Sequence, residues 1–312
     1  MGKSKIEWTH AVWNPVRGCS IVSAGCTNCY AMRYAHRFSS RGFPYEGLTK
    51  ATHGGPVWTG EVRTVPGVLD VPIRWKRPRR IFVNSMSDLF HEGVADEFID
   101  QVFAAMALAP QHVFQILTKR PERALAYLVG RFRSVKYWEA GARGLGYTFL
   151  YQDFSLVRFP LPNVWLGVSV EDQRSADERI PVLLDTPAAV RWISAEPLIG
   201  PVELRPQWFY ADRLRVDSGL DWVVIGGESG PKARPFCPEW ASAIIRQCKG
   251  AGVPVFVKQL GSRVWWEGAP VALKARKGGD PSEWPEDLRV REWPGRQSAE
   301  KTSDAETEVP AL

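Results

Sequence analysis

Three of the chain's five cysteines lie close together near the N-terminus, in the stretch "WNPVRGCSIVSAGCTNCY" at residues 13–30. Cys19, Cys26 and Cys29 could form disulfides, bind a metal, or include a catalytic nucleophile. Three thiolates in one loop can hold zinc or an iron–sulfur cluster. A cluster held by three cysteines keeps one iron free for a substrate or cofactor, whereas zinc needs a fourth ligand. His36, at C-x2-C-x6-H spacing, is available as that ligand.

The composition is that of a soluble globular protein. Of 312 residues, 45% are hydrophobic and 24% are charged. The start, "MGKSKIEWTH", lacks the apolar run of a signal peptide. The longest apolar run, at 102–109, is far shorter than the roughly 20 residues of a membrane span. We therefore predict a cytoplasmic protein with no membrane partner. Disulfides are rare in that compartment, which favours metal binding or catalysis for the clustered cysteines.

The chain carries a formal net charge of +6, and its basic residues gather in two places. One is "RWKRPRR" at 74–80, and the other comprises Arg33, His36, Arg37 and Arg41, just after the cysteines. Such patches favour polyanionic partners, so nucleic acid or a nucleotide is the candidate substrate. A solvated basic surface is the alternative, since no aromatic-rich RNA-binding motif or zinc-finger spacing accompanies the charges.

Short β-branched runs alternate with amphipathic helical patterns along the chain. Continuous apolar strands of this kind are typical of parallel sheets buried on both faces. In the segment 95–109, for example, Phe98, Val102 and Met106 fall on one helical face. Strands are predicted near 6–13 and within 80–88, 112–120, 163–172, 189–197, 221–230 and 253–261, and helices within 95–109, from Pro121, and within 173–186 and 238–252.

This alternation predicts an α/β fold, a partial or closed (β/α) barrel, with a doubly wound sheet as the alternative. Residues 1–295 form a single barrel-like domain in this prediction. Segment 130–161 interrupts the alternation of strands and helices and is predicted to be an insertion that could cover an active site. Residues 262–295, rich in Trp, Pro and charge, form an irregular C-terminal extension, and 296–312 are predicted to be a disordered tail.

Polar and charged side chains follow the predicted strands where each strand ends. In a parallel barrel the functional face lies at these ends. Ser, Thr and Asp are also common helix caps, so single members of the set are weak evidence. Glu171, Glu196 and Glu228 stand at corresponding points of three strand ends, and carboxylates gathered at one mouth repel each other unless a cation or a ligand's donors lie among them. The strand-end set comprises Asn84, Ser85, Ser87, Asp88, Thr118, Lys119, Arg120, Ser169, Glu171, Asp172, Ser194, Glu196, Gly226, Gly227, Glu228, Ser229, Lys258 and Gln259.

Several motifs together resemble one family. They are "WNPVRGCSIVSAGCTNCYA", "SMSDLFHEGV", "LTKRPER", "NVWLGVSVEDQ", "ISAEPLIGPV", "VIGGESGPKARP" and "VKQLG". From about Lys5 to Pro294 the chain is similar to the phage gene-product thirty-seven/sixty-eight family, a phage- and prophage-associated group of unknown function with a three-Cys motif. That family in turn resembles radical S-adenosylmethionine (SAM) enzymes, which have a partial (β/α) barrel and a cysteine loop after the first strand.

The radical-SAM resemblance implies a metal centre. Cys19, Cys26 and Cys29 would hold a [4Fe-4S] cluster whose fourth iron binds SAM. The chain departs from the usual C-x3-C-x2-C pattern, because its first gap is six residues. The aromatic residue also follows the last cysteine, as Tyr30, instead of preceding it.

The resemblance also implies contacts to SAM at the strand ends. The superfamily's Gly-Gly-Glu-like segment after the second strand is replaced here by "NSMSD" at 84–88. A literal Gly-Gly-Glu occurs only after a much later strand, so the amine-binding role is not transferred to its glutamate. The candidate cofactor-binding residues are Asn84, Ser85, Ser169, Glu171, Ser194, Glu196, Gly226, Gly227 and Glu228.

Three function classes follow. The leading one is a radical-SAM-like iron–sulfur enzyme that cleaves SAM reductively and abstracts hydrogen from a nucleic-acid or nucleotide substrate, with a reductant protein as partner. The alternatives are a zinc-stabilised nucleic-acid-binding phage protein and a metal-dependent hydrolase that uses the strand-end glutamates. Of the other cysteines, Cys248 lies on the predicted helix 238–252 and is expected to be a core residue, and Cys237 follows a strand-end loop and could reach the mouth.

Overall fold

A computed structural model describes residues 4, 6–131, 136–147, 158–210 and 219–295. Its main sheet has seven parallel strands in the order β1-β6-β7-β8-β9-β10-β11, which is the order of the chain. A doubly wound sheet would reverse its order at a switch point, so that alternative is wrong. The strands are β1 (Ala11–Trp13), β6 (Arg80–Val83), β7 (Val113–Thr118), β8 (Val164–Ser169), β9 (Val190–Ala195), β10 (Trp222–Gly226) and β11 (Val255–Gln259).

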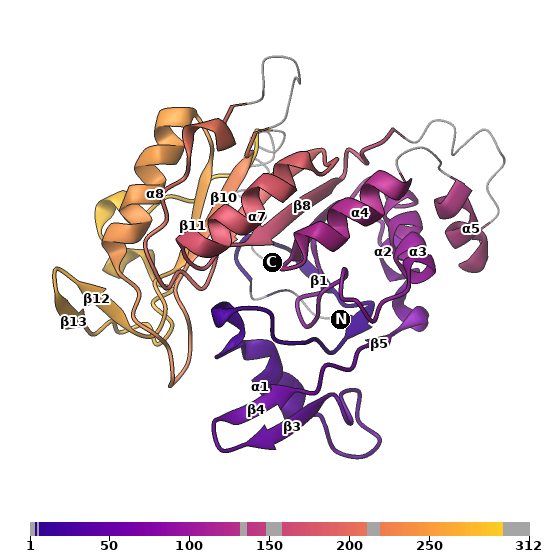
Figure 1. The fold of residues 1–312 in the computed structure, drawn as a ribbon, viewed down its shortest axis with the longest axis horizontal. Coiled ribbons are helices and arrows are strands. Elements are labelled where there is room, and N and C mark those ends of the chain that lie inside the picture. The colour runs from indigo at the N-terminus through magenta and orange to yellow at the C-terminus, as the bar shows by residue number, and fades with distance from the viewer. Residues whose placement is uncertain (1–3, 5, 132–135, 148–157, 211–218, 296–312) are drawn as a thin grey trace, which may run out of the picture.

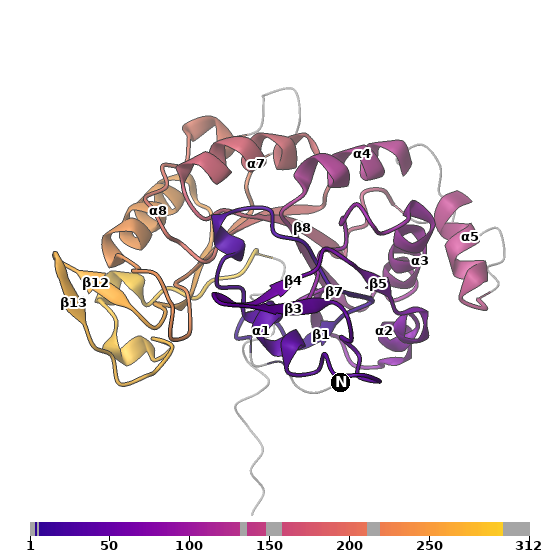
Figure 2. The ribbon, with the colours of Figure 1, turned by 60° about the horizontal axis from the view of Figure 1, so that its bottom comes forward.

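The sheet curves into a partial (β/α) barrel, with β1 and β11 as its two edge strands. Figure 2 shows helices arranged along the convex side of this arc. They begin and end close to the predicted positions, because each buries the apolar stripe that the sequence shows. The helices of this layer are α3 (Asp96–Ala107), α4 (Pro121–Arg131), α7 (Gln173–Asp185) and α8 (Pro238–Ala251), and the short α2 (Val71–Arg74) precedes β6.

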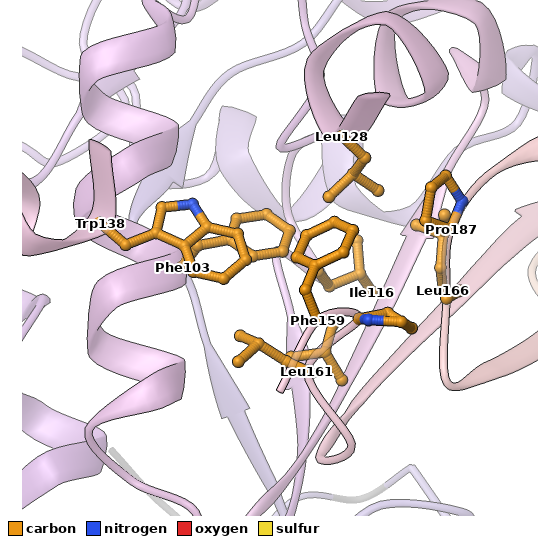
Figure 3. A pocket seen from close by; sticks show the side chains of 11 residues that line it. Phe103, Ile116, Leu128, Trp138, Phe159, Leu161, Leu166 and Pro187 are labelled. Atoms are coloured by element: carbon orange, nitrogen blue, oxygen red, sulfur yellow. The ribbon is translucent and has the colours of Figure 1, made fainter. Parts of the chain in front are cut away.

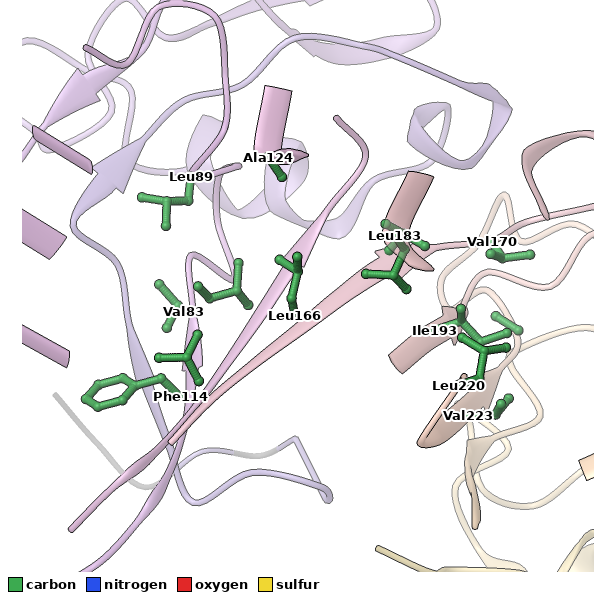
Figure 4. Packing of buried hydrophobic residues seen from close by; sticks show 14 of the residues in the cluster. Val83, Leu89, Phe114, Ala124, Leu166, Val170, Leu183, Ile193, Leu220 and Val223 are labelled. Atoms are coloured by element: carbon green, nitrogen blue, oxygen red, sulfur yellow. The ribbon is translucent and has the colours of Figure 1, made fainter. Parts of the chain in front are cut away.

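The two faces of the sheet have different cores. Alternate strand residues such as Val83, Leu166 and Ile193 pack under the helices (Figure 4). The inner face is filled by a separate aromatic cluster that contains Trp192. Gly167 makes room for this ring, since a Cβ there would lie 2.4 Å from it. The inner cluster comprises Trp8, Phe82, Trp165, Trp192, Trp222, Val224 and Phe256.

Residues 16–64 form a small lobe on the concave side of the arc, below the sheet in Figure 1. We call this segment the N-terminal lobe. Its core joins α1 to a hairpin through Met32, Leu48 and Trp58, and Cys19 and Cys29 pack against that core. Its elements are β2 (Val16–Arg17), η1 (Ala24–Cys26), α1 (Tyr30–His36), β3 (Thr49–Thr52), β4 (Gly55–Trp58) and β5 (Arg63–Thr64), with η2 (Pro66–Val68) following.

The expected insertion contributes a helix, α5 (Lys136–Gly144), that packs on α3. Gly141 allows the close approach, because a Cβ there would lie 2.8 Å from the Asp100 carbonyl oxygen. The described part of this segment therefore thickens the outer helical layer. A small apolar pocket lies beside it, lined by side chains that include Phe103, Trp138 and Phe159 (Figure 3).

The C-terminal extension is more regular than expected. It holds a hairpin, β12 (Val264–Trp266) with β13 (Ala269–Val271), and two turns, η4 (Pro281–Glu283) and η5 (Glu286–Leu288). A further turn, η3 (Pro206–Trp208), precedes β10. The predicted tail, 296–312, lies outside the described residues. Across the part of the chain that the structure describes, no helix combines the length and apolar character needed to cross a bilayer.

Candidate functional site

The polar strand ends meet at one edge of the sheet, as the sequence predicts, because all seven strands run in the same direction. Ser169 of β8 pairs directly with Ser194 of β9. Glu171 and Glu196 follow two residues later, so they point to the same inner face. We call this edge the mouth. It comprises Asn84, Lys119, Ser169, Glu171, Ser194, Glu196, Glu228 and Lys258.

Glu171 is held by two cations of the chain itself. It is only 1% exposed, accepts a hydrogen bond from Arg179 Nη1 at 2.9 Å, and forms an ion pair with Lys119. Burial raises the pKa of its carboxyl, but Lys119 and Arg179 lower it by more, so the pKa lies below its ordinary value. The repulsion expected among the strand-end carboxylates is thus relieved from within the protein.

The loop that carries the cysteines rests on this carboxylate. Ser23 Oγ donates a hydrogen bond to Glu171 Oε1 at 2.9 Å. Gly25 lies directly against the same side chain, where a Cβ would come within 2.3 Å of Oε1. Any larger residue at Gly25 would have to push the loop away from the mouth. Glu171 therefore anchors the first part of the cysteine loop.

Glu228 anchors the second part of the loop. Asn28, between Cys26 and Cys29, donates to Glu228 Oε2 at 3.0 Å. Arg234 donates to both oxygens of this carboxylate, at 2.7 and 3.1 Å. Burial raises the pKa of Glu228, but the hydrogen bonds from Arg234 and Asn28 together lower it by more than that. The pKa of Glu228 therefore also lies below its ordinary value. The cysteine loop is thus hydrogen-bonded to the mouth at two points, Ser23 and Asn28.

A buried arginine reaches Cys19. Arg120 Nη1 lies 4.0 Å from Cys19 Sγ, and its Nη2 donates to Ser20 Oγ at 2.6 Å. Asp88 orients this guanidinium at 3.1 Å from Nη1. Burial raises the pKa of the Cys19 thiol to about 12, with Asp88 adding to the rise and Arg120 opposing it. Arg120 is the cation best placed to stabilise negative charge on this sulfur.

The three thiols lie in one loop, but they are not gathered into a metal site. Burial is the largest cause of the raised thiol pKa values of Cys19 and Cys29, and negative charge on other cysteines of the loop adds to the rise. Within the described residues, no three His, Cys, Asp or Glu side chains are gathered closely enough to hold a metal. The donor set itself, three thiols with Lys119 and Arg120 nearby, fits a sulfur-ligated centre. The sulfurs would have to draw together around it.

His36 is poorly placed as a fourth ligand. It is the last residue of α1, and six helical residues lie between it and Cys29, which corresponds to about 10 Å along the helix axis. Its Nδ1 lies 3.0 Å from Thr49 Oγ1, and this contact is with the hairpin. The zinc alternative would therefore need another ligand or a rearrangement of α1.

Other groups in the mouth lack protein partners. Glu196 Oε1 binds Lys258 Nζ at 2.6 Å, but no described residue donates to Oε2. Ser169 and Ser194, both buried residues, also lie at this edge of the sheet. Asn84, at a φ of 59°, accepts from Val16 N at 3.2 Å while its buried Nδ2 stays unpaired. Because an unpaired buried polar group is costly, the Asn84 amide is suited to hydrogen-bond a polar ligand.

The remaining candidates have contacts within the fold. Ser85 Oγ donates to Asn14 Oδ1 at 3.3 Å, and its carbonyl accepts from the Tyr30 hydroxyl at 2.6 Å. Gly226 lets Glu196 approach, since a Cβ there would lie 3.0 Å from its carboxyl carbon. Gly227 packs against the Leu260 carbonyl oxygen, which a Cβ would approach to 2.1 Å. The two glycines thus serve close packing at the strand ends.

Sequence reasoning missed the residues that hold the loop. Ser23, Asn28, Arg179 and Arg234 were not among the candidates, and Arg120 was included only as a member of the strand-end set. A usable signal exists for two of them. Asn28 lies inside the C-x2-C spacing, and Arg234 lies six residues after Glu228.

The lowered pKa values of Glu171 and Glu228 predict that the folded protein is less stable in acid. Their folded pKa values are lowered, so their stabilisation is complete above about pH 4.5 and is lost as the pH falls through the folded values. Thermal unfolding followed by circular dichroism between about pH 6 and about pH 3 should show a falling midpoint. Glu171→Gln, which removes one of the two titrating groups, should reduce this fall. Identical pH dependence in the variant would contradict the assignment.

The comparisons with known proteins identify one family model. It is described as "Protein of unknown function (DUF5131)", and it matches residues 3–300. Neither the curated proteins nor the solved structures contain a match to the chain.

Proposed function

The chain belongs to the DUF5131 family, and from its site we propose that it is a radical-SAM-type iron–sulfur enzyme. Cys19, Cys26 and Cys29 would hold a [4Fe-4S] cluster, and SAM would bind in the mouth. One observation carries the proposal. The three-thiol loop is fastened over the strand ends of a partial (β/α) barrel, through Ser23 to Glu171 and through Asn28 to Glu228.

The chain supplies positive charge where the thiolates would lie. Arg120 is within 4.0 Å of Cys19, and Lys119 lowers the pKa of Cys29, although burial, the largest effect, raises it. Donors next to ligating sulfurs tune the potential of a metal centre. When bound, the cluster would supply the electron for reductive cleavage of SAM, so that hydrogen can be abstracted from the substrate. We propose a reductant protein as the electron source and the cytoplasm as the compartment.

The polar groups of the mouth match the polar parts of SAM. Glu196 keeps one oxygen free for a cationic ammonium group. The hydroxyls of Ser169 and Ser194 and the amide of Asn84 could hydrogen-bond ribose hydroxyls or a carboxylate. By contrast, Glu171 and Glu228 are satisfied by the protein, so we assign them to loop anchoring and not to SAM.

The ion pairs of Glu171 and Glu228 argue against a hydrolase in which these two glutamates would bind a divalent metal. Such a metal would have to displace Lys119 and Arg179 from Glu171 and Arg234 from Glu228. Displacing them would leave buried cations uncompensated, which is strongly unfavourable.

Binding of SAM tests the proposal. Anaerobic calorimetry should detect SAM binding to the reconstituted protein, and the reduced protein should release 5′-deoxyadenosine. Glu196→Gln removes the charge that faces the ammonium group, so it should weaken binding by roughly ten- to a hundred-fold. Visible absorption of the cluster should be unchanged.

The matched control is Glu178→Gln, an exposed glutamate of α7. It should bind SAM like the wild type. A reconstituted wild-type protein that does not bind SAM would refute the radical-SAM assignment. Hydrolysis that depends on an added divalent metal would then support the hydrolase.

A further inference from the structure

The N-terminal lobe exposes an unusual number of large apolar side chains. Nine such side chains are exposed in the described residues, and six of them lie within 21–43, beside the cysteine loop. Tyr34 is 50% exposed and Phe43 is 51% exposed. The six are Ile21, Val22, Tyr30, Tyr34, Phe38 and Phe43.

Helix α1 explains this exposure. It turns Ala31, Met32 and Ala35 toward the lobe core, so these small and flexible side chains complete the packing. Tyr34 on α1 and Phe38 in the turn just after the helix are both exposed, with ring centroids 5.1 Å apart. The fold of the lobe does not need these rings to be buried.

The lobe that carries these aromatic residues is also rich in cations. Residues 16–64 contain six Lys or Arg and two Glu, a net charge of +4, against +6 for the whole chain. The six are Arg17, Arg33, Arg37, Arg41, Lys50 and Arg63. None of them forms an ion pair with any residue that the structure describes. A polyanion could therefore bind without breaking existing pairs.

The other basic run, 74–80, is largely committed to the fold. Arg79 lies over the Trp75 ring at 4.6 Å, Arg80 lies over Trp293 at 5.1 Å, and Arg74 pairs with Asp70. These three arginines of the run are therefore less available to a partner than the lobe cations that form no ion pair.

We propose that this face of the N-terminal lobe binds single-stranded nucleic acid. Bases would stack on Tyr34, Phe38 and Phe43, and phosphates would contact Arg37 and Arg41. Exposed rings next to cations are the combination that sequence-tolerant single-strand binders use. A duplex would keep its bases stacked internally and could not use the rings.

The surface leads toward the mouth. Tyr30, at the start of α1, continues the row of aromatic residues and donates its hydroxyl hydrogen to the Ser85 carbonyl, next to Asn84. A strand bound along α1 would thus deliver a nucleotide to the strand ends. The inference names the substrate class of the proposed enzyme and to that extent rests on the proposed function. Binding itself requires neither the cluster nor SAM.

Fluorescence anisotropy with a labelled 20-nucleotide DNA strand tests the proposal. The full-length protein as isolated should bind this strand more tightly than the same sequence as a duplex. Tyr34→Ala and Phe38→Ala each remove an exposed ring and should weaken binding by about five- to a hundred-fold. Arg37→Gln should weaken binding and reduce the slope of log K against log salt by roughly 0.7.

Tyr210→Ala and Arg174→Gln are the matched controls, since both residues are exposed and lie outside the lobe. They should bind like the wild type, and circular dichroism should confirm that all variants are folded. Wild-type affinity in Tyr34→Ala and Phe38→Ala would overturn the inference. So would binding confined to duplex DNA, or to vesicles of anionic lipid.

The two proposals can fail separately. A protein that assembles the cluster and binds SAM but not the DNA strand would overturn only this inference. A protein that binds the strand through Tyr34 and Arg37 but never binds SAM would overturn only the proposed function.

Discussion

Anaerobic reconstitution with iron and sulfide should give a brown protein with broad visible absorption and bound iron. Cys19→Ala, Cys26→Ala or Cys29→Ala should each abolish it, because a cluster with only two protein ligands would lack a stable binding site. Iron and sulfide content, measured together with the visible spectrum, gives the result for each variant.

Cys248→Ala is the control for this experiment. Cys248 is buried in the outer core on α8, where burial raises the pKa of its thiol to about 12. Cys248 belongs to the hydrophobic core under the helices and lies outside the cysteine loop, so the variant should take up iron like the wild type. Stoichiometric zinc without iron uptake, lost in His36→Ala, would instead support the zinc-stabilised nucleic-acid-binding protein.

Glu171→Ala should lower the free energy of unfolding by about 3–5 kcal/mol, because it leaves two cations in the mouth without their counter-charge. Arg179 is almost fully buried and Lys119 is largely so. Ser23 would also lose the acceptor that holds the cysteine loop. Urea unfolding followed by circular dichroism measures the change, and limited proteolysis should cleave the loop faster than in the wild type.

Glu178→Ala provides the comparison on the same helix that carries Arg179. Its pair with Arg174 is exposed, with side-chain exposures of 53% and 85%, so its loss should change stability by no more than about 0.5 kcal/mol. If Glu171→Ala were as mild as this control, Glu171 would not be the anchor of the cysteine loop.

The sequence by itself determined the main elements and their direction. Strands buried on both faces leave continuous apolar runs, and helices on one face leave a stripe at helical spacing, so the strands of the sheet and helices α3, α4, α7 and α8 were predictable. The clustering of polar groups at one edge followed from parallel strands alone. The three cysteines were placed near that edge by their position after the first strand.

Only the tertiary structure decided what each of these groups touches. Ser23 and Glu171 are 148 residues apart in the chain, and Asn28 and Glu228 are 200 apart. These pairs exist because the N-terminal lobe folds back over the mouth, with Gly25 permitting the approach. No local pattern specifies which of many cations meets which carboxylate, since that choice depends on the curvature of the sheet and the packing between distant segments. The exposure of Tyr34 and Phe38 could not be predicted from the sequence for the same reason, because it depends on which face of α1 the hairpin covers.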